Sequence, residues 1–161
     1  MPVTVSCRTA KAADWEAYLM TRALAVLRAL GVSRYELSLA LVDDVEMRAL
    51  NSRFRGRDRT TDVLSFPMNE RAFKDALPPA CRGAQRLLGD VAISLDTAAR
   101  QARASRCALA RRLDVLLVHG VLHLLGYDHE LSPAEDLRMR RRAREVEAGL
   151  PARTVARRHR R

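Results

Sequence analysis

The sequence has few of the features that mark exported or membrane-bound proteins. It contains only three cysteines (Cys7, Cys81 and Cys107), which are scattered and include no C-x-x-C pair. Reduced cytosolic thiols without an assigned role are the simplest interpretation of such a set. Residues 1–7 lack the basic-then-apolar pattern of a signal peptide, and the longest nearly apolar run, Val115–Tyr127, is too short to span a bilayer. We therefore expect a cytoplasmic protein with no membrane partner.

Acidic residues are also scarce near the C-terminal end. The whole chain carries a net charge of +10, and residues 137–161 contribute +8 of it, with ten arginines against two glutamates. An arginine-rich segment of this kind suits a phosphate-binding protein, although a solvated and partly disordered end explains residues 151–161 equally well. A length of 161 residues, 48% of them hydrophobic, fits one globular domain. We expect this domain to span residues 1–150, with an arginine-rich, disordered tail at residues 151–161.

The apolar periodicity predicts short strands that alternate with amphipathic helices. The stretches with strand-like patterns are Val3–Cys7, Glu36–Val42, Asp62–Phe66 and Leu87–Ser94. The stretches with helical patterns are Ala12–Leu30, a segment beginning at Asp43, the region from Leu95 to Leu125 with a break near Ser105, and Ser132–Ala148. Glu70–Gln85 shows no strong periodicity and is expected to be a loop. Together these elements predict an α+β (mixed α/β) fold, in which a small, roughly four-stranded sheet is packed by four to five helices in a single compact domain.

Two of the predicted helices begin with capping signals. Asp43 is followed three residues later by Glu46, and Ser132 is followed by Pro133 and Glu135. In this pattern the side-chain oxygen of the capping residue accepts a hydrogen bond from an otherwise unpaired N–H of the first helical turn, and proline is tolerated at the first helical position. We therefore expect helices to start at these two points.

Three of the four histidines fall within the eleven residues His119–His129. His119 and His123 are four residues apart, so on a helix they share one face. Gly126 can end that helix in a left-handed conformation, after which the chain can fold back and bring His129 to the same point. Three histidines with an open fourth position are typical of catalytic zinc, because structural zinc sites are closed by four protein ligands. The pattern predicts one Zn²⁺ per chain, held by these three histidines, with a metal-free structural cluster as the alternative.

The same spacing occurs in the metzincin proteases, whose pattern is H-E-x-x-H-x-x-G-x-x-H. Gly120 stands where those enzymes have the glutamate that activates zinc-bound water. A glycine inside a helix costs roughly 1 kcal/mol relative to alanine. We therefore expect that a substrate or a neighbouring strand approaches the helix closely at Gly120, and the missing glutamate disfavours a peptidase.

Two further stretches have unusual compositions. Residues 51–62 place four arginines within seven positions, directly before a predicted strand. Leu88–Ser94 places one carboxylate, Asp90, in an otherwise apolar strand. Taken singly, the arginine-rich stretch fits a solvated loop, and Asp90 fits either a turn residue at the entrance of the strand or a hydrogen-bonding anchor.

Taken together with the histidine motif, these stretches resemble the YbeY family of bacterial endoribonucleases, which are rRNA maturation factors. The chain has the three blocks of that family in the family's order, as Asn51–Pro67 (ending T-D-V-L-S-F-P), Leu88–Ser94 (L-G-D-V-A-I-S) and His119–His129 (H-G-V-L-H-L-L-G-Y-D-H). The last block matches completely. Thr60 departs from the family, which often has proline there, and this affects the stiffness of the loop more than its chemistry. The resemblance covers roughly residues 20–148.

The resemblance implies a zinc-dependent endoribonuclease specific for single-stranded RNA. Its expected roles are processing of the 3′ end of small-subunit rRNA and ribosome quality control, with rRNA, the ribosome or small-subunit assembly proteins as partners. The matched positions make His119, His123 and His129 the zinc ligands, and Arg55 and His119 the catalytic residues. A guanidinium such as that of Arg55 can bind a phosphate through two hydrogen bonds and offset the charge that builds on it.

Several points stay open at the level of the sequence. Either water or the RNA 2′-hydroxyl can be the nucleophile. Asp128 and Glu130 are the nearby carboxylates that could act as a base or orient a ligand imidazole, although Asp128 also fits a simple turn residue. A non-catalytic, RNA- or ribosome-binding assembly factor with a structural metal is the main alternative function, and a zinc peptidase is a weaker one.

Overall fold

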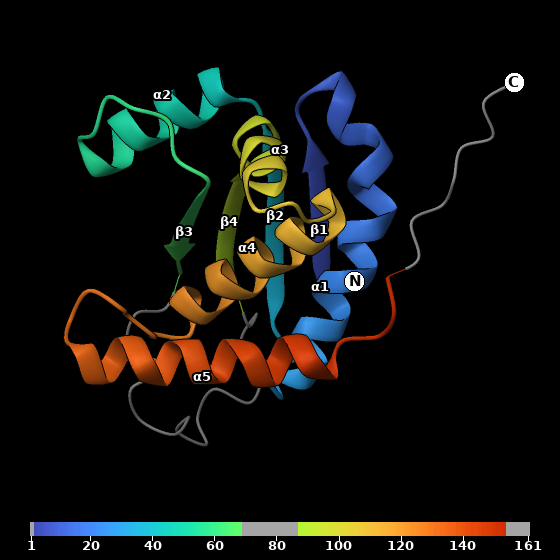
Figure 1. Cartoon of the computed structure of the whole chain (residues 1–161), viewed down its shortest axis with the longest axis vertical. Helices are drawn as coiled ribbons and strands as arrows, with labels where there is room; N and C mark the ends of the chain where they lie inside the picture. Colours follow the sequence, from blue (N-terminus) through green and yellow to red (C-terminus); the bar gives the residue numbers. More distant parts are fainter. Residues whose placement is uncertain (1, 69–86, 154–161) are drawn as a thin grey trace, which may run out of the picture.

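The computed structural model describes residues 2–68 and 87–153 (Figure 1). The loop expected at Glu70–Gln85, Cys81 within it, and the part of the expected tail beyond residue 153 lie outside the described residues.

The described residues form one four-stranded sheet and five α-helices, which confirms the predicted α+β class. The strands are β1 (Val3–Cys7), β2 (Glu36–Val42), β3 (Val63–Pro67) and β4 (Leu87–Ser94). The helices are α1 (Glu16–Ala29), α2 (Asp44–Arg55), α3 (Leu95–Ala104), α4 (Leu109–Leu124) and α5 (Pro133–Gly149), and a 3-10 turn, η1 (Ala10–Trp15), precedes α1. In the sheet the strand order is β1-β2-β4-β3, with β1, β2 and β4 parallel and β3 antiparallel to β4 at one edge.

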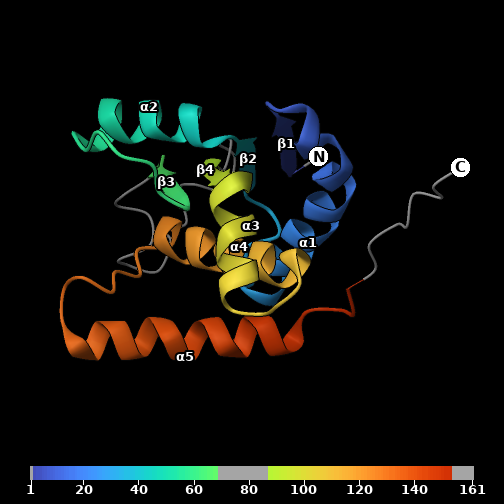
Figure 2. The same ribbon diagram turned by 45° about the horizontal axis from the view of Figure 1, so that its top comes forward.

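The alternation of apolar residues along the strands separates the two faces of the sheet. On one face, Leu39, Val91 and their neighbours pack into the main core with α1 and α4. On the other face, Ala92 and Val42 pack against Met47 of α2 in a smaller cluster. Figure 2 shows α2 on one side of the sheet, and α4 on the other with α5 outermost. Helix α4 is therefore enclosed between the sheet and α5, which explains why most of its side chains are buried.

Both predicted capping signals are used. The Asp43 side chain accepts a hydrogen bond from the N–H of Glu46 at 2.8 Å, and the Ser132 hydroxyl accepts one from the N–H of Glu135 at 3.2 Å. The predicted break near Ser105 is also present, between α3 and α4. The predicted helix Ala12–Leu30 is instead a 3-10 turn followed by α1.

A buried ion pair connects the first and fourth helices to the end of the described chain. Asp114 of α4 is 1% exposed, and its carboxylate accepts hydrogen bonds from the Arg22 guanidinium and the Tyr18 hydroxyl, each at 2.9 Å. Arg153 donates to the same carboxylate at 2.8 Å, and Arg22 also donates to the carbonyl of Pro151. Residues 151–153, which we expected in the tail, are therefore held against the domain.

Candidate metal centre

The C-terminal end of α4 positions the three histidines. Beyond the C-cap residue Leu125, Gly126 adopts φ +89°, in the left-handed region predicted for it. The N–H of Gly126 donates to the His123 carbonyl at 3.0 Å, and the N–H of Tyr127 donates to the Leu122 carbonyl at 3.1 Å. This pair of bonds is the Schellman motif, which ends a helix and reverses the chain. The reversal brings His129 back beside the last turn of α4.

The three imidazoles converge as the spacing predicts. One ring nitrogen from each of His119, His123 and His129 lies within 4.8 Å of the other two, and the ring centroids are 4.5–5.4 Å apart. The Nε2 atoms of His119 and His123 are 3.0 Å apart. Zinc binds imidazole nitrogen at about 2.0–2.1 Å in a tetrahedral arrangement, so small adjustments of these rings suffice to hold one ion. In the part of the chain that the structure describes, no fourth histidine, cysteine or carboxylate joins this group.

The surroundings of His119 and His123 favour their neutral forms. Burial lowers the pKa of His119 to about 4, with His123 and His129 acting in the same direction and the Asp62 carboxylate opposing them. Burial also lowers the pKa of His123, and the neighbouring His129 adds to this effect. A neutral imidazole has the free nitrogen lone pair that a metal requires. The site therefore fits a divalent cation better than it fits a group of protonated histidines.

Gly120 allows α4 to lie directly against the sheet. A Cβ atom at this position would stand 2.7 Å from Cγ1 of Val91 in β4 and 3.3 Å from Cγ2 of Val63 in β3. The Gly120 carbonyl also accepts a hydrogen bond from the Ser65 hydroxyl at 2.9 Å. Of the two explanations given for this glycine, the structure supports close approach of neighbouring strands. A glutamate has no room there, because the position faces Val91 in the core.

Arg55 is the last residue of α2 and reaches the edge strand β3. Its Nη2 donates to the Ser65 carbonyl at 3.4 Å, and its positive charge is among the causes that lower the pKa of His123. The neighbouring Arg53 is exposed, and its guanidinium lies over the Phe54 ring at 5.2 Å. Ser65 therefore contacts both Arg55 and α4. Its hydroxyl donates to the Gly120 carbonyl of α4, and its own carbonyl accepts a hydrogen bond from Arg55.

Asp62 is a further acidic residue near the histidines, and the sequence did not single it out. Its carboxylate accepts hydrogen bonds from Gln101 at 3.1 Å and from Arg112 at 3.5 Å, and its charge raises the pKa of His119. The Thr-Asp pair in the first family block was the available signal. Local spacing cannot show that α3 and α4 supply the two donors.

The other carboxylates considered from the sequence have different positions. Asp128 accepts a hydrogen bond from the N–H of Glu130 at 2.9 Å, which is the turn geometry considered for it, and its charge also raises the pKa of His123. Glu130 is exposed. Asp90 lines a separate cavity with Glu36 and Ser38 rather than joining the histidines.

The chain is similar in sequence to one family of known proteins. A family model described as "Endoribonuclease YbeY" matches residues 5–150. A protein of that name from Anaeromyxobacter sp. strain Fw109-5 is 54% identical over 128 residues, which are 80% of this chain and 61% of the relative. Another of that name, from Aquifex aeolicus, is 46% identical over 114 residues, which are 71% of this chain and 69% of the relative. The chain thus spans less than two thirds of the Anaeromyxobacter protein.

A solved structure supports the fold independently. A Thermotoga maritima protein determined in solution superposes with a TM-score of 0.55, covering 91% of this chain and 89% of that one. Only 23% of its residues are identical, so the likeness concerns the arrangement of helices and strands.

Proposed function

This chain belongs to the endoribonuclease YbeY family, and on that premise we propose that it is a zinc-dependent endoribonuclease that cuts single-stranded RNA. The observation that carries the proposal is the convergence of three histidines on one point, close enough to Arg55 for its charge to act on His123. His119, His123 and His129 would hold the ion with one coordination position left open. A zinc ion bound there would act as a Lewis acid on the phosphate or on an attacking oxygen.

The roles of the chain's own residues follow from their positions. Arg55 offers a planar guanidinium that can hold two oxygens of a phosphate beside the histidines. Asp62 lies on the His119 side of the cluster, where Gln101 and Arg112 fix its carboxylate. Arg55 and His119 remain the proposed catalytic residues, and Asp62 is proposed to orient His119.

The proposed substrate is rRNA, with processing of the 3′ end of small-subunit rRNA and ribosome quality control as the biological roles. The net charge of +10 supports binding to a polyanion. The ribosome or small-subunit assembly proteins are the proposed partners, and the cytoplasm, where ribosomes assemble, is the proposed location. Among the described residues there is no helix with the length and apolar character needed to cross a membrane.

The open coordination position favours catalysis over the alternative of a structural metal in an assembly factor. A peptidase is disfavoured because the packing of Gly120 against Val91 leaves no room for the glutamate that such an enzyme requires.

The test is cleavage of a defined RNA by protein whose metal content has been measured. We expect about one zinc per chain, cleavage of the single strand, little cleavage of the matching duplex, and loss of activity on chelation that added zinc reverses. His123→Ala should lose both the metal and the activity. Full activity in metal-free protein, or equal zinc content in wild type and His123→Ala, would refute the proposed metal site.

A further inference from the structure

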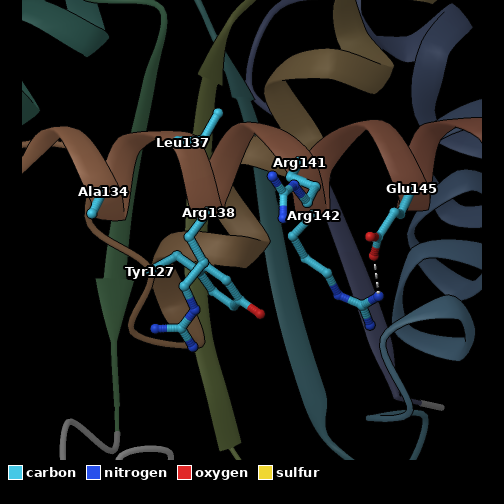
Figure 3. A pocket seen from close by; sticks show the side chains of 7 residues that line it. All are labelled: Tyr127, Ala134, Leu137, Arg138, Arg141, Arg142 and Glu145. Carbon is cyan, nitrogen blue, oxygen red and sulfur yellow. Dashed lines mark hydrogen bonds and ion pairs between the residues drawn. The ribbon is translucent and has the colours of Figure 1, made fainter.

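A cavity of about 300 Å³ opens between the turn that follows α4 and the outer face of α5 (Figure 3). Tyr127 lines it from the turn. The side chains that line it from α5 include Leu137, Arg138, Arg141, Arg142 and Glu145. Its volume is at the lower end of the range for small-ligand pockets, which suits one nucleobase or a similar flat group.

The cavity combines a flat aromatic surface with arginines. The guanidinium carbon of Arg138 lies 4.8 Å from the centroid of the Tyr127 ring, and Figure 3 shows the Arg138 side chain crossing that ring. The Tyr127 N–H donates to the Leu122 carbonyl in the Schellman turn, and its side chain packs against the main core. The ring is therefore held in place before any ligand arrives.

The charge of the lining is positive. Arg142 is paired with Glu145 at 2.9 Å, which fixes its guanidinium at one end of the cavity. Arg141 is exposed and has no ion-pair partner among the described residues. Leu137, which is 55% exposed, adds an apolar contact beside these charges. An anion that also presents a flat, partly apolar group complements this combination.

We propose that this cavity binds a nucleotide of single-stranded RNA outside the cleavage site, an inference that rests on the proposed function. The base stacks on the Tyr127–Arg138 pair, because aromatic rings and guanidinium planes are the surfaces on which unpaired bases stack. Arg141 binds a neighbouring phosphate. Tyr127 is two residues before His129 in the segment that joins α4 to α5, so an RNA strand bound at the proposed metal centre can reach the cavity. An acidic protein segment would match the arginines but would leave the stacked pair unused.

Two double variants on α5 test the proposal with the same loss of charge. Arg138→Ala/Arg141→Ala removes two arginines of the cavity, and Arg140→Ala/Arg144→Ala removes two exposed arginines that do not line it. The dissociation constant for a fluorescein-labelled single-stranded RNA is measured by anisotropy, with zinc-loaded and with chelated full-length protein. The cavity variant should bind about fivefold or more weakly and the control less than about twofold. Equal losses in both, or no loss in either, would overturn the proposal.

Two substitutions of Tyr127 test whether its aromatic ring contributes to RNA binding. Tyr127→Phe keeps the stacking surface and should bind RNA as wild type does, whereas Tyr127→Leu should lose about fivefold or more. Zinc content and melting temperature are measured for both variants. If Tyr127→Leu loses zinc, its weaker RNA binding does not report on the ring, and the two double variants on α5 test the proposal. In kinetic assays the cavity variant should raise KM and leave kcat nearly unchanged, since the contact is made equally in the ground and transition states.

The outcomes separate this inference from the proposed function. RNA binding that depends on the cavity, in a protein that cuts no RNA, would support the subsite and refute the nuclease. RNA cleavage with equal affinity in all variants would support the nuclease and overturn the subsite. A polyglutamate peptide that binds as tightly as RNA of equal charge, and loses affinity in the cavity variant, would overturn RNA as the occupant.

Discussion

Replacing Gly120 by alanine sets two physical effects against each other. A glycine within a helix costs roughly 1 kcal/mol relative to alanine, so helix propensity alone makes Gly120→Ala stabilising. The added Cβ would stand 2.7 Å from Cγ1 of Val91, whereas carbon atoms pack at about 3.5–4.0 Å. Val91 is 1% exposed and has a stiff, β-branched side chain. It cannot rotate away, so α4 and β4 must separate by roughly 1 Å.

The packing effect should win. Overpacking a core of this kind costs typically about 1–3 kcal/mol, and subtracting the propensity gain of about 1 kcal/mol leaves a net loss of up to about 2 kcal/mol, with a central value of about 1 kcal/mol. For a chain of this length the central value corresponds to a melting temperature lower by about 2–4 °C. Zinc affinity should fall as well, because α4 carries His119 and His123 while His129 follows on the turn.

Urea unfolding of zinc-free and zinc-loaded protein measures both effects. Gly149→Ala in α5 is the matched control, since a Cβ there meets no atom within 4 Å, and it should be neutral or slightly stabilising. Val91→Ala removes the methyl groups that the new Cβ would meet. Gly120→Ala should therefore lower the free energy of unfolding less in a Val91→Ala protein than in wild type, with a coupling energy of about 1 kcal/mol. If Gly120→Ala is as stable as wild type and binds zinc equally well, the close packing of α4 is not the reason for this glycine.

Three further predictions concern other parts of the structure. Arg55→Ala should keep its zinc but cut single-stranded RNA at least about tenfold more slowly, equal to about 1.4 kcal/mol of barrier, whereas Arg53→Ala should lose much less; an unchanged rate in Arg55→Ala would remove Arg55 from the mechanism. The pKa of His119 is lowered to about 4 from 6.5, so the unfolded chain takes up its proton first as the pH falls. The urea midpoint of zinc-free protein should therefore decrease between about pH 6.5 and pH 4, and His119→Asn should weaken that dependence; a midpoint that does not change over this range would contradict it. Truncation after residue 150 removes the Arg153 contact to the buried Asp114 and should lower the urea midpoint relative to truncation after residue 153; equal midpoints would show that the contact adds no stability.

Local patterns in the sequence were sufficient for most of the elements. The strands β1, β2 and β4 have the predicted bounds, because alternating apolar residues specify a strand with one or both faces buried. The convergence of the histidines was also predictable, since helical spacing and one left-handed glycine determine it within eleven residues.

Contacts between distant segments were not predictable in the same way. Arg55 reaches the histidine side of the fold because β3 pairs antiparallel to β4 at the sheet edge, and no local pattern encodes that pairing. Asp62 gains its place beside His119 from donors on α3 and α4, 39 and 50 residues further along the chain. The three residues 151–153 looked like part of a polar tail because their buried partner, Asp114, is 39 residues before Arg153.

The carboxylate of Asp114 accepts hydrogen bonds from α1 and from Arg153, two segments that are synthesised at different times. Tyr18 and Arg22 emerge first, Asp114 follows, and Arg153 emerges last. Arg22 and Tyr18 can pair with this carboxylate before Arg153 arrives, but the domain reaches its full stability only after Arg153 has added its own contact. His129 lies before Arg153 in the chain, so all three histidines of the candidate metal site are synthesised before the last contact to Asp114 can form. If the proposed zinc site is correct, the order of synthesis allows the metal to bind before the last step of folding.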